Sequence, residues 1–298
     1  MLINNYLNYI GSKDRYLPQI LKFIESGAAK LGGSPLLIDM CCGSAVVGLN
    51  ALHSGCVSQV LCVDACKELI SMHNWVKQHM SAESLLADID LIISAYALDK
   101  KNKEGFLRLR EDYNAYARCG GLSPRQLYAL ITHSFNYSLQ TNKSGEFNVP
   151  FGKDKSCFNK SLRKKLTNWK NALDEVKNIT FTSGDFDNYR DFTNCILFVD
   201  PPYSASISKH PYRIGNIKWT EEEDRRLFKY LDYMGNSGNL FIFTNATENN
   251  GTTNLPLLHW IDEHKYTSTP VSVDYTGCNY QRKNNGKTNE VIITNFKL

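Results

Sequence analysis

The sequence predicts an α/β fold: a mostly parallel, Rossmann-like sheet with an inserted helical segment that carries a β-hairpin. Short apolar runs that end in an acid, residues 36–39 and 196–200, are typical of parallel strands buried on both faces. Apolar residues at helical spacing separate these runs, so helices are expected on both sides of the sheet. We therefore divide the chain into two sheet-forming parts, residues 1–67 and 161–298, and an insert, residues 68–160.

The N-terminal segment combines a small-residue turn with a lysine. Gly11, Ser12 and Lys13 precede apolar residues at helical spacing that begin at Leu17. A turn of this kind at the start of a helix predicts a site for an anion, because free N–H groups and the helix dipole both favour negative charge.

The first two expected strands belong to a nucleotide-binding pattern. Residues 36–39 are followed by a glycine turn, residues 40–44, and by a helical pattern from Val46, which is how such units open. The second strand, residues 60–63, ends in Asp64, about 20 residues after the turn, where an acid can hold the hydroxyl pair of a ribose. This pattern fits NAD and S-adenosylmethionine equally well.

The insert is mostly helical, and the segment of residues 100–170, which begins inside the insert and ends beyond it, is basic. Residues 100–170 hold 15 Lys and Arg and 5 Asp and Glu, whereas the rest of the chain holds 19 and 25. This asymmetry predicts contact with a phosphate backbone, and a solvated charged face is the alternative. Residues 142–145, between extended runs at 138–141 and 147–149, predict a hairpin turn.

Helices and strands alternate again after the insert. The patterns predict helices at 162–176 and 221–234, strands at 179–181, 196–199 and 240–243, and a final hairpin of 271–275 and 291–295. Antiparallel strands are therefore expected at the C-terminal edge of the sheet.

The tetrapeptide Asp200-Pro201-Pro202-Tyr203 follows the strand at 196–199 and predicts a rigid polar cup. Neither proline has an N–H group and each fixes its own φ, so carbonyls and one carboxylate face outward as acceptors. The exocyclic amine of a planar base needs two such acceptors and an aromatic face for stacking. The cup therefore favours an amino-methylating site, and with it S-adenosylmethionine over NAD; a turn with an acidic tip is the alternative.

The composition indicates a reducing compartment and no membrane span. Hydrophobic residues make up 42% of the chain, and no apolar run approaches the roughly 18 residues that a membrane span needs. The N-terminus lacks the basic start and long apolar stretch of a signal peptide. Nine cysteines without a Cys-x-x-Cys pair predict free thiols and a cytoplasmic location, and a zinc site is the weaker alternative.

These motifs together resemble Dam-type DNA adenine-N6 methyltransferases of the alpha class. Their order also resembles that family, with donor-site motifs first, then a target-recognition insert, then the tetrapeptide. The similar segments are residues 8–13, 39–44, 64, 106–114, 145–152 (GEFNVPFG), 185–186, 200–203, 244–245 and 289–296. The resemblance implies S-adenosylmethionine as the cofactor, double-stranded DNA as the partner, no metal, and a monomer or weak dimer on DNA.

The resemblance assigns the first part of the cofactor site to residues around the glycine turn. Tyr9 and Lys13 are expected to hold the carboxylate of the methionine moiety. Asp39 and Gly43 belong to the glycine-turn motif, and Gly43 lets the backbone approach the cofactor. Asp64 is expected to bind the ribose.

Asp185 and Phe186 match the family's pocket for the adenine of the cofactor, with Phe186 stacking on the ring. The alternatives are an ordinary turn residue for Asp185 and core packing for Phe186.

The catalytic role falls to the tetrapeptide. Asp200 and the Pro201 carbonyl are expected to accept hydrogen bonds from the target amine, which frees the nitrogen lone pair for in-line attack on the methyl group. Tyr203 is expected to stack on a base flipped out of the duplex. Tyr212 and Trp219 are candidates to close over that base, and packing of their loop is the alternative.

A DNA-facing set is implied for the insert and the N-terminal motif. It comprises Asn8, Phe135, Asn136, Ser138, Gln140, Asn142, Pro150, Lys153 and Asp154. Members that read GATC carry Arg at the position of Gln140, whereas a glutamine suits the N6/N7 edge of adenine. A site other than plain GATC is therefore expected, and the alternative is that Gln140 only caps the hairpin.

Besides Gln140, the glycine-turn motif and two single positions depart from the family pattern. Residues 39–43 read DMCCG in place of Asp-Pro-Phe-x-Gly, so a looser donor pocket is expected. Asp154 stands where relatives carry Arg or Tyr, and Asn8 replaces a basic residue.

Two other functions compete with methylation of adenine in DNA. The same fold can methylate cytosine-N4 in DNA or adenine in RNA, but the segment at 145–152 argues against this. A DNA-binding module without catalysis is the second alternative, and the intact tetrapeptide, Lys13 and Asp64 argue against it.

Overall fold

The computed structural model describes residues 2–8, 11–142, 144–203, 213–214, 217–249, 251–271 and 288–298. Its elements are, in chain order, η1 (Lys13–Arg15), α1 (Leu17–Lys30), β1 (Leu36–Met40), α2 (Val46–Ser54), β2 (Gln59–Asp64), α3 (Lys67–Gln78), α4 (Ala82–Ala95), α5 (Lys103–Arg118), α6 (Pro124–His133), η2 (Phe135–Tyr137), α7 (Lys160–Glu175), β3 (Ile179–Ser183), η3 (Phe186–Tyr189), β4 (Ile196–Val199), β5 (Arg213–Ile214), β6 (Ile217–Lys218), α8 (Glu221–Asn236), β7 (Leu240–Asn249), β8 (Thr252–Thr253), α9 (Leu255–His264), β9 (Thr267–Pro270) and β10 (Thr288–Thr294).

The main sheet is mixed, with the strand order β3-β2-β1-β4-β7-β10-β9 and with β8 paired to β7. The strands from β3 to β7 in this order are parallel, whereas β10 runs antiparallel to β7 and β9 antiparallel to β10. The predicted Rossmann-like α/β fold is confirmed. β1 and β4 are neighbours, and their register pairs Met40 with Val199, so the glycine turn and the tetrapeptide leave the sheet at the same edge.

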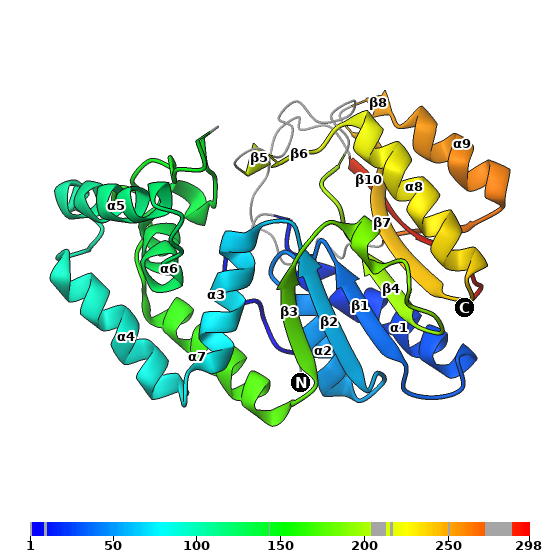
Figure 1. The fold of residues 1–298 in the computed structure, drawn as a ribbon, viewed down its shortest axis with the longest axis horizontal. Helices are drawn as coiled ribbons and strands as arrows, with labels where there is room; N and C mark the ends of the chain where they lie inside the picture. The colour runs from blue at the N-terminus through cyan, green and yellow to red at the C-terminus, as the bar shows by residue number, and fades with distance from the viewer. Residues whose placement is uncertain are drawn as a thin grey trace.

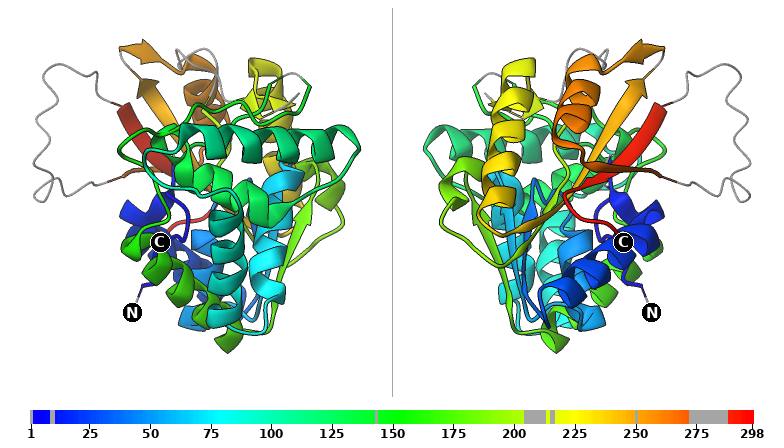
Figure 2. Two further views of the ribbon diagram at one scale, coloured as in Figure 1. Left: turned by 90° about the vertical axis from the view of Figure 1, so that its left-hand side faces the viewer. Right: turned by 90° about the vertical axis from the view of Figure 1, so that its right-hand side faces the viewer.

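Helices cover both faces of the sheet. α1 and α2 lie on one face, and α8 and α9 lie on the other (Figures 1 and 2). The alternation of side chains in β4 explains both layers: Ile196 and Phe198 belong to the core under α1 and α2, whereas Leu197 and Val199 belong to the core under α8 and α9.

Capping residues set the starts of several helices. The Thr220 side chain accepts a hydrogen bond from the Glu223 N–H at the start of α8, whose first turn holds four acidic residues that favour the positive end of the helix dipole. Asn159 and Asn254 cap α7 and α9 in the same way. Among the described residues, no helix is long and apolar enough to cross a bilayer.

The helices α4, α5 and α6 lie beside the sheet, whereas α3 and α7 lie between them and the sheet (Figure 1). Their apolar side chains, such as Leu85 and Phe106, belong to the same core cluster as Leu37 and Val60 of the sheet. The predicted boundary at residue 68 falls inside α3. The division of the chain into two sheet-forming parts and an insert stays a prediction.

Three elements differ from the sequence expectation. The hairpin at 138–149 is irregular, since its described residues form an isolated bridge between Thr141 and Phe147 in place of two full strands. In the C-terminal hairpin, the strand paired to β10 is β9, before the predicted arm at 271–275, of which residues 272–275 lie outside the described part. The polar, half-exposed sequence of β9 and its terminal Pro270 suit an edge strand. The helix α9 has no counterpart among the expected elements.

Candidate active site

The carboxyl edge of the central strands borders a cleft of about 680 Å³, here called the main cleft. The glycine turn after β1, Asp64 at the end of β2 and the tetrapeptide after β4 all line it. The N-terminal segment, with Asn8 and residues 11–16, lines it as well. The structure therefore brings four motifs that are far apart in the sequence into one cavity.

Asp200 is held by two donors on the same carboxylate oxygen. Lys13 Nζ lies 2.8 Å from Asp200 Oδ1, and the Thr244 hydroxyl donates to this oxygen at 2.6 Å. The Asp200 N–H also donates to the Met40 carbonyl at 3.3 Å, which extends the pairing of β4 with β1. Lys13, predicted to hold the methionine carboxylate, is 7% exposed and reaches Asp200, the predicted catalytic residue, so it lies between the two predicted sites.

The aromatic residue of the tetrapeptide lies beside this ion pair. The Lys13 ammonium is 5.5 Å from the centre of the Tyr203 ring, which favours both groups electrostatically. Burial, and after it the negative charge of Asp200, raises the pKa of the Tyr203 hydroxyl well above its ordinary value, so the ring stays neutral. Pro201 is buried and Pro202 is half-buried, and both line the main cleft. The roles of these three residues toward a target base stay predictions.

The glycine turn is fixed by the acid at the end of the neighbouring strand. The Gly43 N–H donates to Asp64 Oδ2 at 3.0 Å, and the Cys66 N–H donates to Asp64 Oδ1 at 2.8 Å. Gly43 has a φ of 50°, in the left-handed region that favours glycine. Burial raises the pKa of Asp64, although the two N–H groups act in the opposite direction. Asp64 lines the main cleft, which is the position its predicted ribose role requires.

A buried histidine supports this turn from behind. The neutral His73 ring bonds the Gly43 carbonyl through Nε2 at 2.8 Å and the Tyr6 hydroxyl through Nδ1 at 3.0 Å. Burial lowers the pKa of His73 to about 4, so Nε2 carries the proton toward the carbonyl and Nδ1 accepts from Tyr6. The ring also stacks on Phe181, with centroids 5.0 Å apart. No local pattern predicts this support, because the partners of His73 are 30 and 67 residues away in the sequence.

Asp39 has a different position from the other predicted cofactor residues. It is buried, does not line the main cleft, and accepts a hydrogen bond from the Gly48 N–H at 2.9 Å. Burial raises the pKa of Asp39 well above its ordinary value. Its contact ties β1 to α2 beneath the glycine turn, so any effect on the cofactor acts through the turn.

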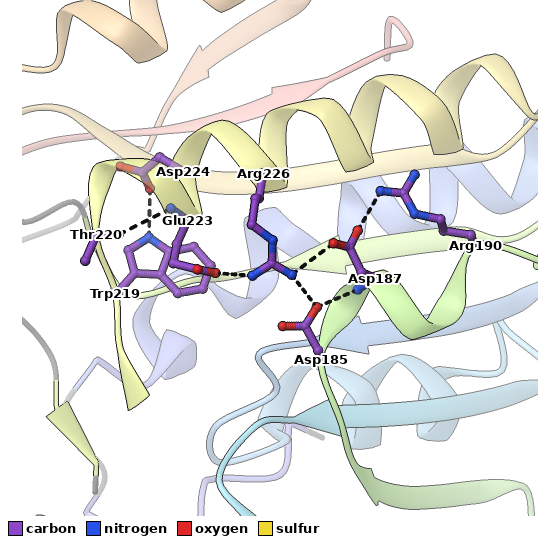
Figure 3. A network of polar contacts seen from close by, with 8 residues as sticks. All are labelled: Asp185, Asp187, Arg190, Trp219, Thr220, Glu223, Asp224 and Arg226. Atoms are coloured by element: carbon purple, nitrogen blue, oxygen red, sulfur yellow. Dashed lines mark hydrogen bonds and ion pairs between the residues drawn. The ribbon is translucent and has the colours of Figure 1, made fainter. Parts of the chain in front are cut away.

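A smaller hollow of about 270 Å³, here called the side hollow, shares Cys41, Asp64, Ala65 and Trp219 with the main cleft. Asp185 and Phe186, the predicted adenine pair, line it together with Arg226 of α8. Asp185 Oδ1 accepts from the Asp187 N–H at 2.9 Å and from Arg226 at 2.8 Å (Figure 3). Arg226 also bonds Asp187 and Glu223, at 2.9 and 2.6 Å. This network holds η3 against the start of α8.

Phe186 packs in the core and also lines the side hollow. It is buried, and its ring lies 5.3 Å from Tyr230 and 4.8 Å from the Arg226 guanidinium, centre to centre. Both readings of this residue, core packing and a wall of the adenine pocket, are therefore compatible with its place.

Trp219 lies in the wall between the two cavities. Its indole N–H donates to Asp224 at 2.7 Å (Figure 3), and the residue is 7% exposed. It lines both the main cleft and the side hollow, which puts it next to the predicted cofactor pocket as well as the tetrapeptide. Closure of Trp219 over a target base stays a prediction. Tyr9 and Tyr212 lie outside the described residues.

The predicted DNA-facing stretch begins with an exposed aromatic. Phe135 is 52% exposed, and the two residues after it, Asn136 and Tyr137, have φ of 55° and 54°. Two successive residues in this region are uncommon, and such backbone strain is frequent at binding sites. Ser138 is half-exposed, and its carbonyl accepts from the Ser134 hydroxyl.

Asn142, not Gln140, caps the hairpin turn. The Asn142 side chain accepts from the N–H groups of Ser144 and Glu146, and it donates to the Glu146 carboxylate at 2.8 Å. Gln140 is exposed, and its side chain bonds no other described residue. The glutamine amide is therefore free to meet a ligand. Pro150 is exposed too, and its carbonyl accepts from the Phe135 N–H.

The remaining DNA-facing candidates lie in two separate places. Lys153 and Asp154 are exposed, and the Asp154 N–H bonds the Lys100 carbonyl at 2.8 Å, which joins two lysine-rich loops. Asn8 bonds Lys165 of α7 at 3.0 Å, and both line the main cleft. Asn8 is therefore beside the predicted catalytic site and not on the hairpin.

Metal and disulfide chemistry have no visible basis in the described ranges. No group of three or more His, Cys, Asp or Glu is placed to hold a metal ion there, and the cysteines in those ranges are free thiols. Burial raises the pKa of Cys41 and Cys42 in the glycine turn, which keeps these thiols protonated.

The fold is that of a Rossmann-like α/β protein, with a cleft and an acidic tetrapeptide at the ends of its central strands. Residues 9–269 match the D12 class N6 adenine-specific DNA methyltransferases, and the chain belongs to this family.

Several curated proteins are similar to nearly the whole chain. The type II methyltransferase M.FokI of Planomicrobium okeanokoites is 30% identical over 99% of this chain and 43% of its own length. The modification methylases StsI of Streptococcus sanguinis and LlaI of Lactococcus lactis subsp. lactis are 29% and 28% identical, over 99% and 97% of this chain and 43% of their own lengths. The chain thus spans less than half the length of these relatives.

Proposed function

We propose that this chain transfers a methyl group from S-adenosylmethionine to the N6 amine of an adenine flipped out of duplex DNA. The observation that carries the proposal is the position of Asp200. It lines the main cleft with Oδ1 bonded to Lys13 and Thr244 and with Oδ2 free of partners among the described residues. An ionised acceptor held in one orientation suits an amine that gains positive charge during the reaction.

The residues that line the two cavities support this cofactor by their chemistry. Asp64 would take the ribose, the left-handed Gly43 would allow close approach beside it, and the side hollow would take the adenine against Phe186. Asp185 would accept from the adenine amine through Oδ2, which bonds no other described residue. Bound there, S-adenosylmethionine supplies an electrophilic methyl group on a sulfonium.

The protein's own contribution is mainly orientation. Asp200 Oδ2 and the Pro201 carbonyl would accept the two hydrogens of the target amine, so the nitrogen lone pair points at the methyl carbon. The bond from nitrogen to carbon forms as the bond from carbon to sulfur breaks, and the sulfonium becomes a neutral thioether. The nitrogen then loses one proton to solvent. Tyr203, held neutral, would stack on the base.

The insert would supply contact with DNA. The excess of basic residues over 100–170 suits a phosphate backbone, and the exposed Phe135 and Gln140 offer a stacking face and an amide for base edges. A flipped base is required because the N6 amine cannot reach a deep cleft while it is paired.

The test uses the purified chain with labelled S-adenosylmethionine and, in parallel, unmethylated duplex DNA and RNA of the same sequence. Digestion to nucleosides and mass spectrometry identify the product. The proposal expects N6-methyladenine in DNA. N4-methylcytosine, or label in RNA alone, would favour the alternatives, and no transfer to any nucleic acid would overturn the proposal.

Asp200→Ala is the control for the assignment of the acid. It should lower methyl transfer by at least about 10²-fold, the usual cost of removing a charge-stabilising group. Cofactor affinity should change by no more than a few fold, because Asp200 faces the target side. Transfer above about 1% of wild type would remove Asp200 from the chemistry.

A further inference from the structure

Two side chains from distant parts of the sequence meet on one oxygen of Asp200. Lys13 comes from η1, near the N-terminus, and Thr244 comes from β7, 44 residues after the acid. Both donate to Oδ1, at 2.8 and 2.6 Å. A carboxylate that is bonded through one oxygen cannot rotate freely, so its other oxygen keeps a defined direction.

The register of the sheet explains why the Thr244 hydroxyl lies level with the Asp200 carboxylate. β4 ends at Val199, whereas β7, beside it, continues to Asn249. The register pairs Val199 with Phe243, so Thr244 stands level with Asp200, one residue beyond the last pair. On its other side Thr244 pairs with Ile292 of β10, and the residue is 3% exposed. The hydroxyl is therefore carried by a central strand whose position is fixed from both sides.

The Lys13 ammonium has other partners besides Asp200, whereas the Thr244 hydroxyl has only one close acceptor among the described residues. The Lys13 ammonium also bonds the Gly11 carbonyl and lies over the Tyr203 ring, within the predicted reach of the cofactor. The Thr244 hydroxyl has one strong acceptor, because its contact with the Val199 carbonyl is long, at 3.4 Å. The Thr244 hydroxyl therefore donates its one hydrogen bond to Asp200 Oδ1.

We infer that Thr244 is a positioning residue for methyl transfer, which fixes Asp200 so that Oδ2 is the acceptor for the target amine. The inference rests on the proposed function. It assigns Thr244 no contact with the cofactor or the base, so its loss should slow the chemical step and leave cofactor binding unchanged.

The test compares single-turnover methylation of duplex DNA by wild type, Thr244→Val and Thr244→Ser, with cofactor affinity measured by calorimetry. Valine keeps the branched shape without the hydroxyl, and a hydrogen bond to a charged group is worth about 10- to 150-fold. Thr244→Val should therefore be slower by about this factor, with cofactor affinity within 3-fold. Thr244→Ser should recover the rate to within about 3-fold of wild type.

Thr294 provides the matched control. It lies in β10 of the same sheet, is fully buried, and donates to the Phe296 carbonyl at 2.7 Å, far from the carboxylate. Thr294→Val removes a buried hydroxyl too and should lower thermal stability while the rate stays within about 3-fold of wild type. If Thr244→Val disturbs packing, Thr244→Ala is the second variant without the hydroxyl.

Three results would overturn the inference: Thr244→Val as fast as wild type, Thr244→Ser as slow as Thr244→Val, or an equal loss of rate in Thr294→Val. These failures are distinguishable from failure of the proposed function. If the proposed function fails, the wild-type chain itself transfers no methyl group to any nucleic acid, and the inference about Thr244 then fails together with the proposed function.

Discussion

The buried His73 should make the fold less stable at mildly acidic pH, because its ring binds a proton more readily in the unfolded chain. The pKa of His73 is lowered to about 4 in the folded chain, against about 6.5 when unfolded, because burial excludes the charged ring. Acid therefore protonates the unfolded chain first, and stability is lost as the pH falls from about 6.5 toward 4. Between pH 8 and pH 5 this linkage removes about 2 kcal/mol of unfolding free energy.

Other groups titrate in the same range, so the measurement must isolate this ring. His73→Gln is a suitable variant, because the glutamine Nε2 can still donate to the Gly43 carbonyl but does not titrate. Urea unfolding of both proteins at several pH values gives the difference in their unfolding free energies. The unfolding free energy of wild type minus that of His73→Gln should fall by about 2 kcal/mol from pH 8 to pH 5. A difference that stays constant within about 0.5 kcal/mol would refute the argument, because a ring with an ordinary pKa shows no such linkage.

Three further predictions concern ligands. Asp64→Ala should weaken cofactor binding by roughly 10- to 150-fold, the value of a hydrogen bond to a charged group, and unchanged affinity in calorimetry would remove Asp64 from the site. DNA binding should show a slope of log K against log[salt] near −5 if five or six basic residues of the insert reach phosphates, and a flat response would mean that the insert faces away from DNA. Gln140→Arg should shift base preference toward guanine at one pair by roughly 1–3 kcal/mol, measured by sequencing of methylated genomic DNA; modification of GATC alone by wild type would contradict this reading.

Sequence reasoning succeeded where the chemistry is local. The strand ends, the glycine turn and the tetrapeptide are each contained in a few consecutive residues, and the sheet register brings them together. The helices α7 and α8 were predicted to within two residues at each end, because their apolar spacing and caps are in the sequence. The edge strand β9 was missed because an edge needs few apolar residues and tolerates proline.

The contacts that orient the site could not be predicted. Thr244 was part of a segment that resembles the family, but nothing local links its hydroxyl to Asp200. Arg226 reads as a charged residue on an exposed helix face, yet it bonds three carboxylates beside the predicted adenine pocket. Such links depend on how strands and helices pack, which periodicity alone does not contain.

Three of the acids that line the cavities, Asp64, Asp185 and Asp200, differ in how they are held, and the difference matches their proposed roles. Asp200 and Asp185 each have one oxygen bonded by two protein donors, and the other oxygen has no partner among the described residues. Each can thus present one directed acceptor to an amine, the target amine in one case and the cofactor amine in the other. Asp64 has both oxygens bonded to backbone N–H groups, so a ribose would use the second lone pair of each oxygen. We therefore expect removal of Asp64 to loosen the glycine turn as well as the proposed ribose contact, whereas removal of the Thr244 hydroxyl should disturb only the direction of one acceptor.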